Sequence, residues 1–246
     1  METIVAERPV GELVGERIAR SRVFDEYGID YCCGGEKTLI EACSLKDVSL
    51  DEVVAKLIEA DGAETATEDV DYGSMALDLL VDHIVSTHHA YLARELPRLN
   101  GLAQKVAHAH ATNDPRVLLL ESVLRALSDE LLAHMGKEEQ VLFPFIRKFA
   151  TTDTLPFMPF GMLANPITAM ESDHKNVGDA LAQIRILTDD YAEPHWACTT
   201  YHALLEGLKE LEQDLHRHIH KENNILFPRA LRTESQRKQG GEDLKA

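Results

Sequence analysis

The segments His134–Pro144, HMGKEEQVLFP, and His218–Pro228, HIHKENNILFP, are two copies of one pattern, H-x-x-x-E-[EN]-x-x-L-F-P, which lie 84 positions apart. Residues four positions apart share one face of an α-helix and are separated by about 6 Å along its axis. Each copy can therefore direct an imidazole and a carboxylate at a common point. One such pair alone is typical of a contact on a helix surface. Its recurrence with the same Leu-Phe-Pro tail indicates equivalent places in a duplicated helix pair.

Each copy also follows another histidine at nearly the same distance. His89 lies 45 residues before His134, and His174 lies 44 residues before His218. The spacing predicts two related halves, each with a helix that bears one histidine and a helix that bears a histidine and a glutamate. Imidazoles and carboxylates that converge from four helices are typical of a two-metal site. The candidate metal ligands are His89, His134, Glu138, His174, His218 and Glu222.

Twelve histidines leave part of this choice open. His88 and His89 both lie near an apolar stripe, and the spacing between the halves favours His89 without deciding it. His216 and His220 are also four residues apart, yet only His218 is in register with the first copy. The histidines without a matching partner are interpreted as solvated or locally bonded; they are His108, His110, His195 and His202.

The types of ligand favour iron. Imidazole suits iron, zinc and copper, and carboxylates are hard donors that can bridge two ions. No cysteines stand at zinc-finger spacing, which argues against a structural zinc site. Two ferrous ions with two glutamates carry the same formal charge as two ferric ions with two glutamates and one oxo group. An iron pair can therefore change oxidation state without changing the charge buried in the helices.

Composition excludes several classes of protein. A chain of 246 residues with 44% hydrophobic residues can bury a core and suits one medium domain with a small one. The net charge of −17 argues against binding to nucleic acid, which needs a basic face. No apolar run reaches the length of a membrane span, and the charged N-terminus lacks a signal core, so we expect a cytosolic protein. Four cysteines in such a chain indicate free thiols in a reducing compartment.

The pattern of apolar residues predicts an all-α fold. Asp114–Pro115 and Asn165–Pro166 are typical of helix starts, with the polar residue as the N-cap. Apolar residues then recur at intervals of three and four, as in Leu118, Leu119, Val123 and Leu127. Long helices are expected over roughly 74–110, 114–149, 166–189 and 196–231, which would form a four-helix bundle. The predicted domains are a helical domain at 1–62 with a Cys-Cys-Gly-Gly motif, a polar linker at 63–73, the bundle at 74–232 and a polar tail at 233–246.

Several motifs together resemble a known family. One histidine and H-x-x-x-E, repeated, is similar to the hemerythrin-like domain. The fragments KEEQVLFP, MESDH, ACTTY and ENNILFPRAL, with DYCCGG near the N-terminus, resemble the di-iron proteins that repair iron–sulfur clusters, the Repair of Iron Centres or ScdA-like family. The resemblance runs from VGELV to FPRAL. It implies that the six candidate residues bind two non-haem iron ions, with Glu138 and Glu222 as bridging carboxylates beside an oxo group.

The resemblance also implies a function. The family protects or restores iron–sulfur clusters damaged by nitric oxide or oxidants, so the expected partners are damaged iron–sulfur proteins that accept iron. One alternative is an enzyme that reduces nitric oxide to nitrous oxide at the iron pair. Another is a protein that binds or senses oxygen or nitric oxide. No nucleic-acid or membrane partner is expected, and the oligomeric state stays open between a monomer and a homodimer.

The remaining cysteines and prolines have plainer interpretations. Adjacent Cys32 and Cys33 do not have C-x-x-C redox spacing, so the residues alone favour small turn cysteines, with Gly34 and Gly35 supplying positive φ. The family resemblance instead favours a functional thiol pair that receives iron or nitrosyl groups. Cys43 and Cys198 are interpreted as ordinary buried residues. The paired prolines, Pro144 and Pro228, are expected to kink or end their helices.

The duplicated motif makes one prediction about metal content. The purified chain is expected to hold two iron ions, because two histidine–glutamate pairs and two further histidines suffice for two ions. Metal analysis by mass spectrometry measures this directly. A preparation with one zinc ion per chain would contradict the assignment.

Overall fold

The computed structural model describes residues 6–62, 70–152 and 156–243, which form helices and the turns that connect them. Within these ranges the only pairing of the β type is an isolated bridge between Pro9 and Thr38. The predicted all-α fold is therefore confirmed. Among the same residues, no helix combines the length and the apolar character that a bilayer-spanning segment needs.

The chain divides into two compact units. The first unit comprises Met1–Val81, Lys148–Pro156 and His216–Ala246, and the second comprises Asp82–Arg147 and Phe157–Leu215. Helices α5 (Leu77–Ile84), α8 (Phe143–Thr151) and α10 (Thr199–His220) contribute residues to both units.

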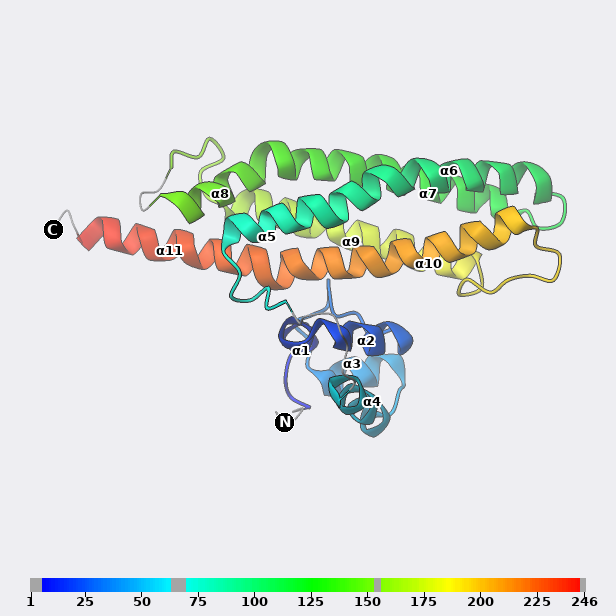
Figure 1. Ribbon diagram of the computed structural model, residues 1–246, viewed down its shortest axis with the longest axis horizontal. Coiled ribbons are helices and arrows are strands. Elements are labelled where there is room, and N and C mark those ends of the chain that lie inside the picture. The colour runs from blue at the N-terminus through cyan, green and yellow to red at the C-terminus, as the bar shows by residue number, and fades with distance from the viewer. Residues whose placement is uncertain (1–5, 63–69, 153–155, 244–246) are drawn as a thin grey trace. The chain divides into compact units, whose positions relative to one another are not determined.

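The first unit contains a cluster of short helices around its own core (Figure 1). The capping box that Thr38 and Glu41 form at the start of α3 satisfies two backbone N–H groups of that helix. Phe24, Tyr31 and Leu39 are among the largest side chains that the core buries completely. The elements of this cluster are α1 (Val10–Glu16), η1 (Ile18–Arg20), α2 (Ser21–Glu26), α3 (Leu39–Lys46) and α4 (Leu50–Gly62).

Two glycines let this cluster approach the π-helical turn η4 (Lys221–Leu226) closely. A Cβ atom at Gly11 or at Gly35 would lie 2.5 Å from Oδ1 of Asn224. The amide of Asn224 in turn donates hydrogen bonds to the backbone oxygens of Tyr31 (3.4 Å) and Cys32 (3.0 Å). The sequence-based reason for the glycines was wrong, because neither Gly34 nor Gly35 has a positive φ. Gly35 is required for close approach.

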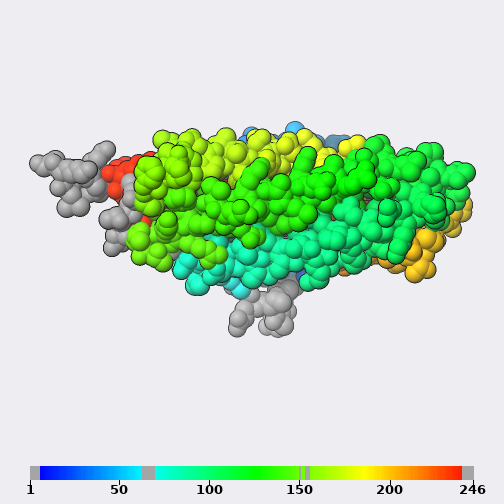
Figure 2. All heavy atoms as spheres, turned by 90° about the horizontal axis from the view of Figure 1, so that it is seen from above, coloured from blue at the N-terminus to red at the C-terminus, as the bar shows by residue number. Residues whose placement is uncertain are grey.

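The second unit is built from long helices that run side by side (Figure 1). Helix α7 packs against α6 and against α9, and Figure 2 shows the side chains of α7 flanked by those of both neighbours. The part of α10 up to Leu215 completes this unit. The bounds are α6 (Ala90–His110), α7 (Arg116–Lys137) and α9 (Ala164–Leu187).

The expected ranges of the first three long helices agree approximately with the structure, but two local details do not. The helix α9 begins at Ala164, one residue before the predicted cap, and the Asn165 amide donates to the backbone oxygen of Phe160 instead. In α7, Leu118 and Leu119 are exposed, not buried. The leucines of this segment form two apolar stripes with helical spacing, and either could pack against a neighbouring helix. The buried stripe is the one that shares a face with His134. Its apolar members are Val117, Leu120, Leu124, Leu127 and Leu131.

In the part of the chain that the structure describes, three π-helical turns interrupt the long helices, and each contains a candidate ligand. They are η2 (Val85–His89), η3 (Glu138–Leu142) and η4 (Lys221–Leu226). Pro144 and Pro228 follow the last two and neither ends its helix, because α8 and α11 (Phe227–Asp243) continue past them. A proline inside an α-helix collides with the carbonyl group four residues earlier, and the wider π-turn relieves that collision. Of the two expectations for these prolines, a kink or an end of the helix, the end is therefore wrong, and α11 continues through Asp243, past the predicted limit at 231.

The predicted linker at 63–73 lies in part outside the described residues, as does the end of the predicted tail, 244–246. Residues 70–73 lie between α4 and α5, and the side chain of Arg229 in α11 donates to the backbone oxygen of Tyr72 at 3.1 Å. The domain boundaries at 62 and 74 stay a prediction.

The buried guanidinium of Arg20 gives a prediction about stability. Arg20 is 3% exposed and binds both carboxylate oxygens of Asp61, at 2.9 and 2.7 Å. We expect Arg20→Ala to lower the free energy of unfolding by about 3 kcal/mol, because it removes a buried guanidinium together with its ion pairs to Asp61 and Glu16. Urea unfolding of the full chain, followed by circular dichroism, measures the change.

Arg8 provides the matched control, because it shares the partner Glu16 with Arg20 while its side chain is 30% exposed. Arg8→Ala is expected to cost about 0.5 kcal/mol, as is usual for solvent-exposed ion pairs. Equal losses in the two variants would show that burial of Arg20 does not contribute to stability.

Candidate metal centre

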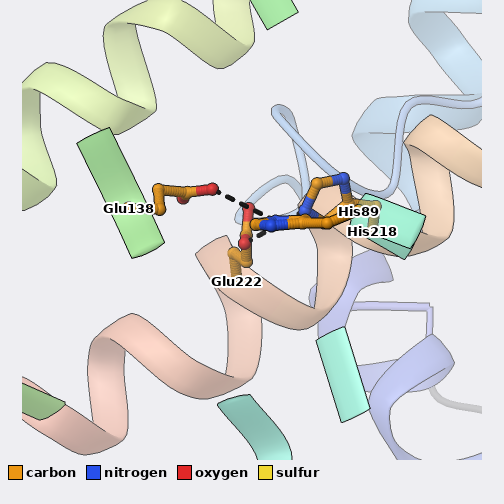
Figure 3. A group of neighbouring side chains, drawn as sticks. All are labelled: His89, Glu138, His218 and Glu222. Atoms are coloured by element: carbon orange, nitrogen blue, oxygen red, sulfur yellow. Dashed lines mark hydrogen bonds and ion pairs between the residues drawn. The ribbon is translucent and has the colours of Figure 1, made fainter. Parts of the chain in front are cut away.

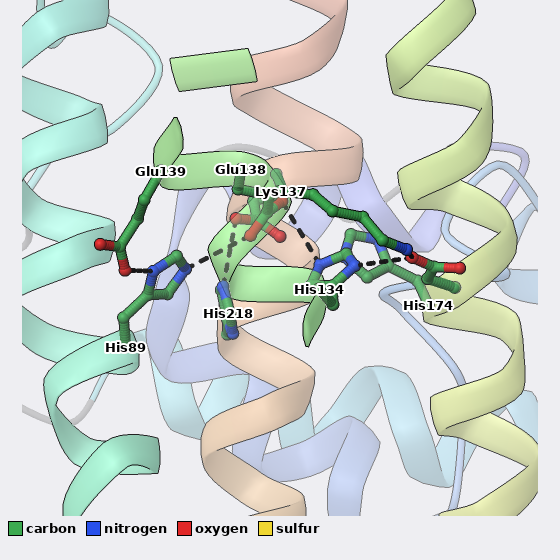
Figure 4. Close-up of polar contacts among 9 residues, drawn as sticks. His89, His134, Lys137, Glu138, Glu139, His174 and His218 are labelled. Atoms are coloured by element: carbon green, nitrogen blue, oxygen red, sulfur yellow. Dashed lines mark hydrogen bonds and ion pairs between the residues drawn. The ribbon is translucent and has the colours of Figure 1, made fainter. Parts of the chain in front are cut away.

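The π-turn η2 directs His89, and not His88, toward a buried glutamate. His89 Nε2 lies 3.4 Å from Oε2 of Glu138, and His89 Nδ1 lies 2.8 Å from Oε1 of Glu139 (Figure 4). His88 faces another way and pairs with Asp214, with 2.9 Å between Nδ1 and Oδ1. Both histidines are buried, so burial does not distinguish them. The spacing between the two halves of the sequence favoured His89, and His89 is the one that faces Glu138.

His134 contacts three polar side chains, one of which is the same glutamate. Its Nε2 atom lies 3.4 Å from Oε1 of Glu138 and 3.1 Å from Nε2 of His174. Its Nδ1 atom lies 3.2 Å from Oδ2 of Asp173, an oxygen that also accepts a hydrogen bond from Lys137 Nζ at 2.9 Å. The Lys137 ammonium and the His134 imidazole offset the effect of burial on Asp173, so the pKa of that carboxyl is below its usual value.

The second copy of the motif has the expected local geometry. His218 and Glu222 stand one helical turn apart, with 3.1 Å between Nε2 and Oε1. Both side chains are buried, and Glu222 is 0% exposed. The pair is held at the end of α10 and the start of η4.

The six candidate ligands form two groups of four. In each group the ligand atoms all lie within 4.8 Å of one another. Figure 3 shows the first group, with His89 and His218 directed at the two glutamates. The first group is His89, Glu138, His218 and Glu222, and the second is His134, Glu138, His174 and Glu222.

The chemistry of this donor set fits a metal ion. All six side chains are at most 3% exposed, and Glu138 and Glu222 are both fully buried. A buried carboxylate is costly unless a cation or several hydrogen-bond donors compensate its charge. Imidazole nitrogen and carboxylate oxygen together are typical ligands of iron in helical bundles.

Comparisons with known proteins agree with this geometry. Residues 80–230 match the model of the hemerythrin HHE cation binding domain, and residues 6–61 match a domain of unknown function named ScdA_N. The iron–sulfur cluster repair protein YtfE of Enterobacter sp. (strain 638) is 39% identical over 92% of this chain and 97% of its own length. The protein of the same name from Escherichia coli O81 (strain ED1a) is 38% identical, with the same coverage. This chain belongs to the hemerythrin-like iron–sulfur cluster repair family.

A hemerythrin HHE domain implies that the chain binds iron. In metal sites, a histidine that binds the metal through one ring nitrogen commonly donates a hydrogen bond from the other ring N–H to a carboxylate. This hydrogen bond fixes the tautomer and the orientation of the imidazole. Glu139 and Asp173 are placed to do this for His89 and His134. The sequence analysis missed both residues. The available signal was their position, because Glu139 follows Glu138 and Asp173 precedes His174.

Cys32 and Cys33 lie in a turn that contacts η4 through Asn224. Oδ1 of Asp30 accepts hydrogen bonds from the backbone N–H groups of Cys32 (3.0 Å) and Cys33 (2.9 Å). The two sulfur atoms are 4.0 Å apart and form no disulfide. The hydrogen bond with Cys33 and burial raise the pKa of the Cys32 thiol well above its usual value, so Cys32 holds its proton at neutral pH. Asp30, Cys32 and Cys33 also form a third group of possible metal ligands within 4.8 Å.

The contact between His89 and Glu139 gives a prediction about metal affinity. We expect Glu139→Gln to weaken iron binding by about tenfold, because the neutral amide no longer stabilises the orientation and basicity of the imidazole. Competition with a chromogenic chelator measures the affinity.

Glu130→Gln is the matched control, since Glu130 is an exposed glutamate two turns earlier, in α7. It changes the net charge by the same amount and should leave the affinity unchanged. If both variants lose affinity equally, the loss reflects overall charge and not the orientation of His89.

Proposed function

We propose that the chain binds two iron ions and that Glu138 and Glu222 bridge them. The observation that supports this is the composition of the two ligand groups. Each group has two histidines of its own, while both glutamates belong to both groups. A carboxylate has two oxygens, so a glutamate that belongs to both groups can bridge two neighbouring ions. His89 and His218 would hold one ion, and His134 and His174 the other.

We propose further that the protein repairs damaged iron–sulfur clusters by supplying iron to them. The names of the two relatives support repair as the function. The ligand set supports iron supply, because four of the six ligands are neutral imidazoles. Two carboxylates should hold two iron ions less firmly than the carboxylate-rich sites of ferritin-like bundles do. Iron is then cargo.

The turn at Asp30–Cys33 is the proposed place where iron or a nitrosyl group leaves the protein. Asn224 joins this turn to η4, the segment that carries Glu222. A carboxylate and two sulfur atoms offer the soft and hard donors that iron accepts. Cys33 is partly exposed and Cys32 is buried, so a transfer partner would meet Cys33 first.

An iron-transfer experiment tests the proposal. The full chain is loaded with isotopically labelled ferrous iron and mixed with an acceptor whose [4Fe–4S] cluster has been damaged by nitric oxide. We expect label to appear in the acceptor together with its cluster absorbance. Glu138→Leu should fail to load. Cys32→Ser/Cys33→Ser should load normally and transfer more slowly.

The matched control is Cys43→Ser, since Cys43 is a buried cysteine in the same helical cluster. This variant should transfer at the wild-type rate. If labelled iron stays with the wild-type chain while the acceptor remains damaged, iron donation is wrong.

The same shared glutamates favour a second candidate function, the reduction of nitric oxide. Two ferrous ions side by side would supply two binding positions and the two electrons that convert two nitric oxide molecules and two protons into nitrous oxide and water. Anaerobic addition of nitric oxide with gas chromatography of the headspace tests this. Many turnovers per chain with an electron donor would support an enzyme. Reversible binding without nitrous oxide would instead support a sensor or carrier.

A further inference from the structure

A cysteine and a histidine far from the metal centre form a close pair. Sγ of Cys198 lies 3.1 Å from Nε2 of His110. Cys198 immediately precedes α10, and His110 is the last residue of α6. Helix α6, which follows His89 and ends at His110, has 21 residues, which corresponds to about 30 Å along the axis. The interpretation of Cys198 as an ordinary buried residue was wrong, because it is partly exposed.

Two aromatic rings hold the imidazole of His110 in place. Its ring centroid lies 5.3 Å from that of Trp196 and 6.1 Å from that of Tyr201, with the Tyr201 ring stacked on it. The preceding loop is anchored by an ion pair, in which Arg116 binds Asp189 at 3.0 Å. A nucleophile, a base within hydrogen-bond reach and a support that orients the base are the parts of an activated thiol.

The surroundings of Cys198 differ from those of the other cysteines. The hydrogen bond with His110, assisted by the backbone N–H groups of Tyr201 and Thr200 and opposed by burial, lowers the pKa of Cys198 to about 7. Burial raises the pKa of Cys43, and the pKa of Cys32 is also raised. The lowered pKa increases the share of the nucleophilic thiolate at neutral pH.

We propose that Cys198 is a reactive thiolate that is oxidised by small peroxides, with His110 as the proton donor. The sulfur is partly exposed, and its imidazole partner is flanked by two aromatic rings, which suits a small uncharged electrophile such as hydrogen peroxide. Nothing in this pair depends on the metal centre, so the site is a second one in the same chain. Its modification would report peroxide at the far end of α6.

The reaction is a two-electron oxidation of sulfur. Sγ of Cys198 attacks one oxygen of the peroxide, an S–O bond forms and the O–O bond breaks. The other oxygen leaves as hydroxide, or as alkoxide from an alkyl hydroperoxide, and takes up the proton that the Cys198 thiol has passed to His110, giving water or alcohol. The products are a sulfenic acid on Cys198 and one molecule of water or alcohol, with peroxide as the oxidant.

The first test is the pH dependence of alkylation. The full chain is treated briefly with iodoacetamide from pH 5.5 to 9.5, and each cysteine peptide is quantified by mass spectrometry. We expect the rate at Cys198 to rise with a midpoint near 7. In His110→Gln the midpoint should move to about 8.5, the value of an ordinary thiol. A wild-type midpoint at or above 8.5 overturns the proposal, whatever the variant does.

His108→Gln is the matched control, because His108 is an exposed histidine half a turn away in the same helix. It should leave the alkylation midpoint unchanged. A shift as large as that of His110→Gln would show that helix α6 as a whole, and not the contact with Cys198, sets the reactivity.

The second test uses the proposed oxidant. Hydrogen peroxide is added below one equivalent to the iron-loaded chain, and dimedone traps sulfenic acid. We expect the adduct on Cys198, its absence in Cys198→Ser and a reduced yield at pH 6 in His110→Gln. Oxidation confined to residues around the His89 and His134 side chains would indicate chemistry of bound iron and would overturn the proposal. So would an unmodified Cys198 that remains open to iodoacetamide.

Discussion

The burial of two carboxylates is the constraint on which the rest of the structure depends. Glu138 and Glu222 are both 0% exposed, and a buried negative charge without compensation destabilises a fold by several kcal/mol. The chain meets this constraint with a shell of imidazoles, of which His89, His134 and His218 each approach a glutamate oxygen within 3.4 Å. Neutral imidazoles relieve only part of that cost, so the donor set suits cations. Stability of the helices and capacity for metal are therefore coupled through the same two side chains.

The Leu-Phe-Pro tail shows how local chemistry serves this constraint. Each proline follows its glutamate by six residues, and a π-turn lies between the two. The wider turn removes the collision that proline causes in an α-helix, and the long helix continues. The repeat in the sequence is thus a repeat of backbone geometry as well as of ligands. A third π-turn, η2, is not followed directly by a proline; it directs His89 toward Glu138, while His88 pairs with Asp214.

The four cysteines show how surroundings decide the reactivity of one residue type. Cys32 and Cys43 are buried, and their pKa values are raised. Cys198 lies at a helix start beside His110, and its pKa is lowered. At Cys32 the hydrogen bond with Cys33 and burial raise the pKa, and the nearby Asp30 carboxylate raises it further. A carboxylate favours the protonated thiol, whereas an imidazole and backbone N–H groups favour the thiolate.

The sequence by itself determined the helical class, the approximate limits of three of the four long helices and a set of six candidate ligands in which His89 was favoured over His88. It could do so because the period of the helix converts spacing into a shared face, and because a duplicated motif reports its own register. Tertiary structure decided what no single helix contains. It selected the stripe of α7 that includes Leu120 and Leu124 over the one that includes Leu118 and Leu119, since both have helical spacing. It brought Glu139 to His89 and His110 to Cys198, pairs that lie 50 and 88 residues apart. Periodicity places residues on the face of one helix, but only packing between helices decides which faces meet.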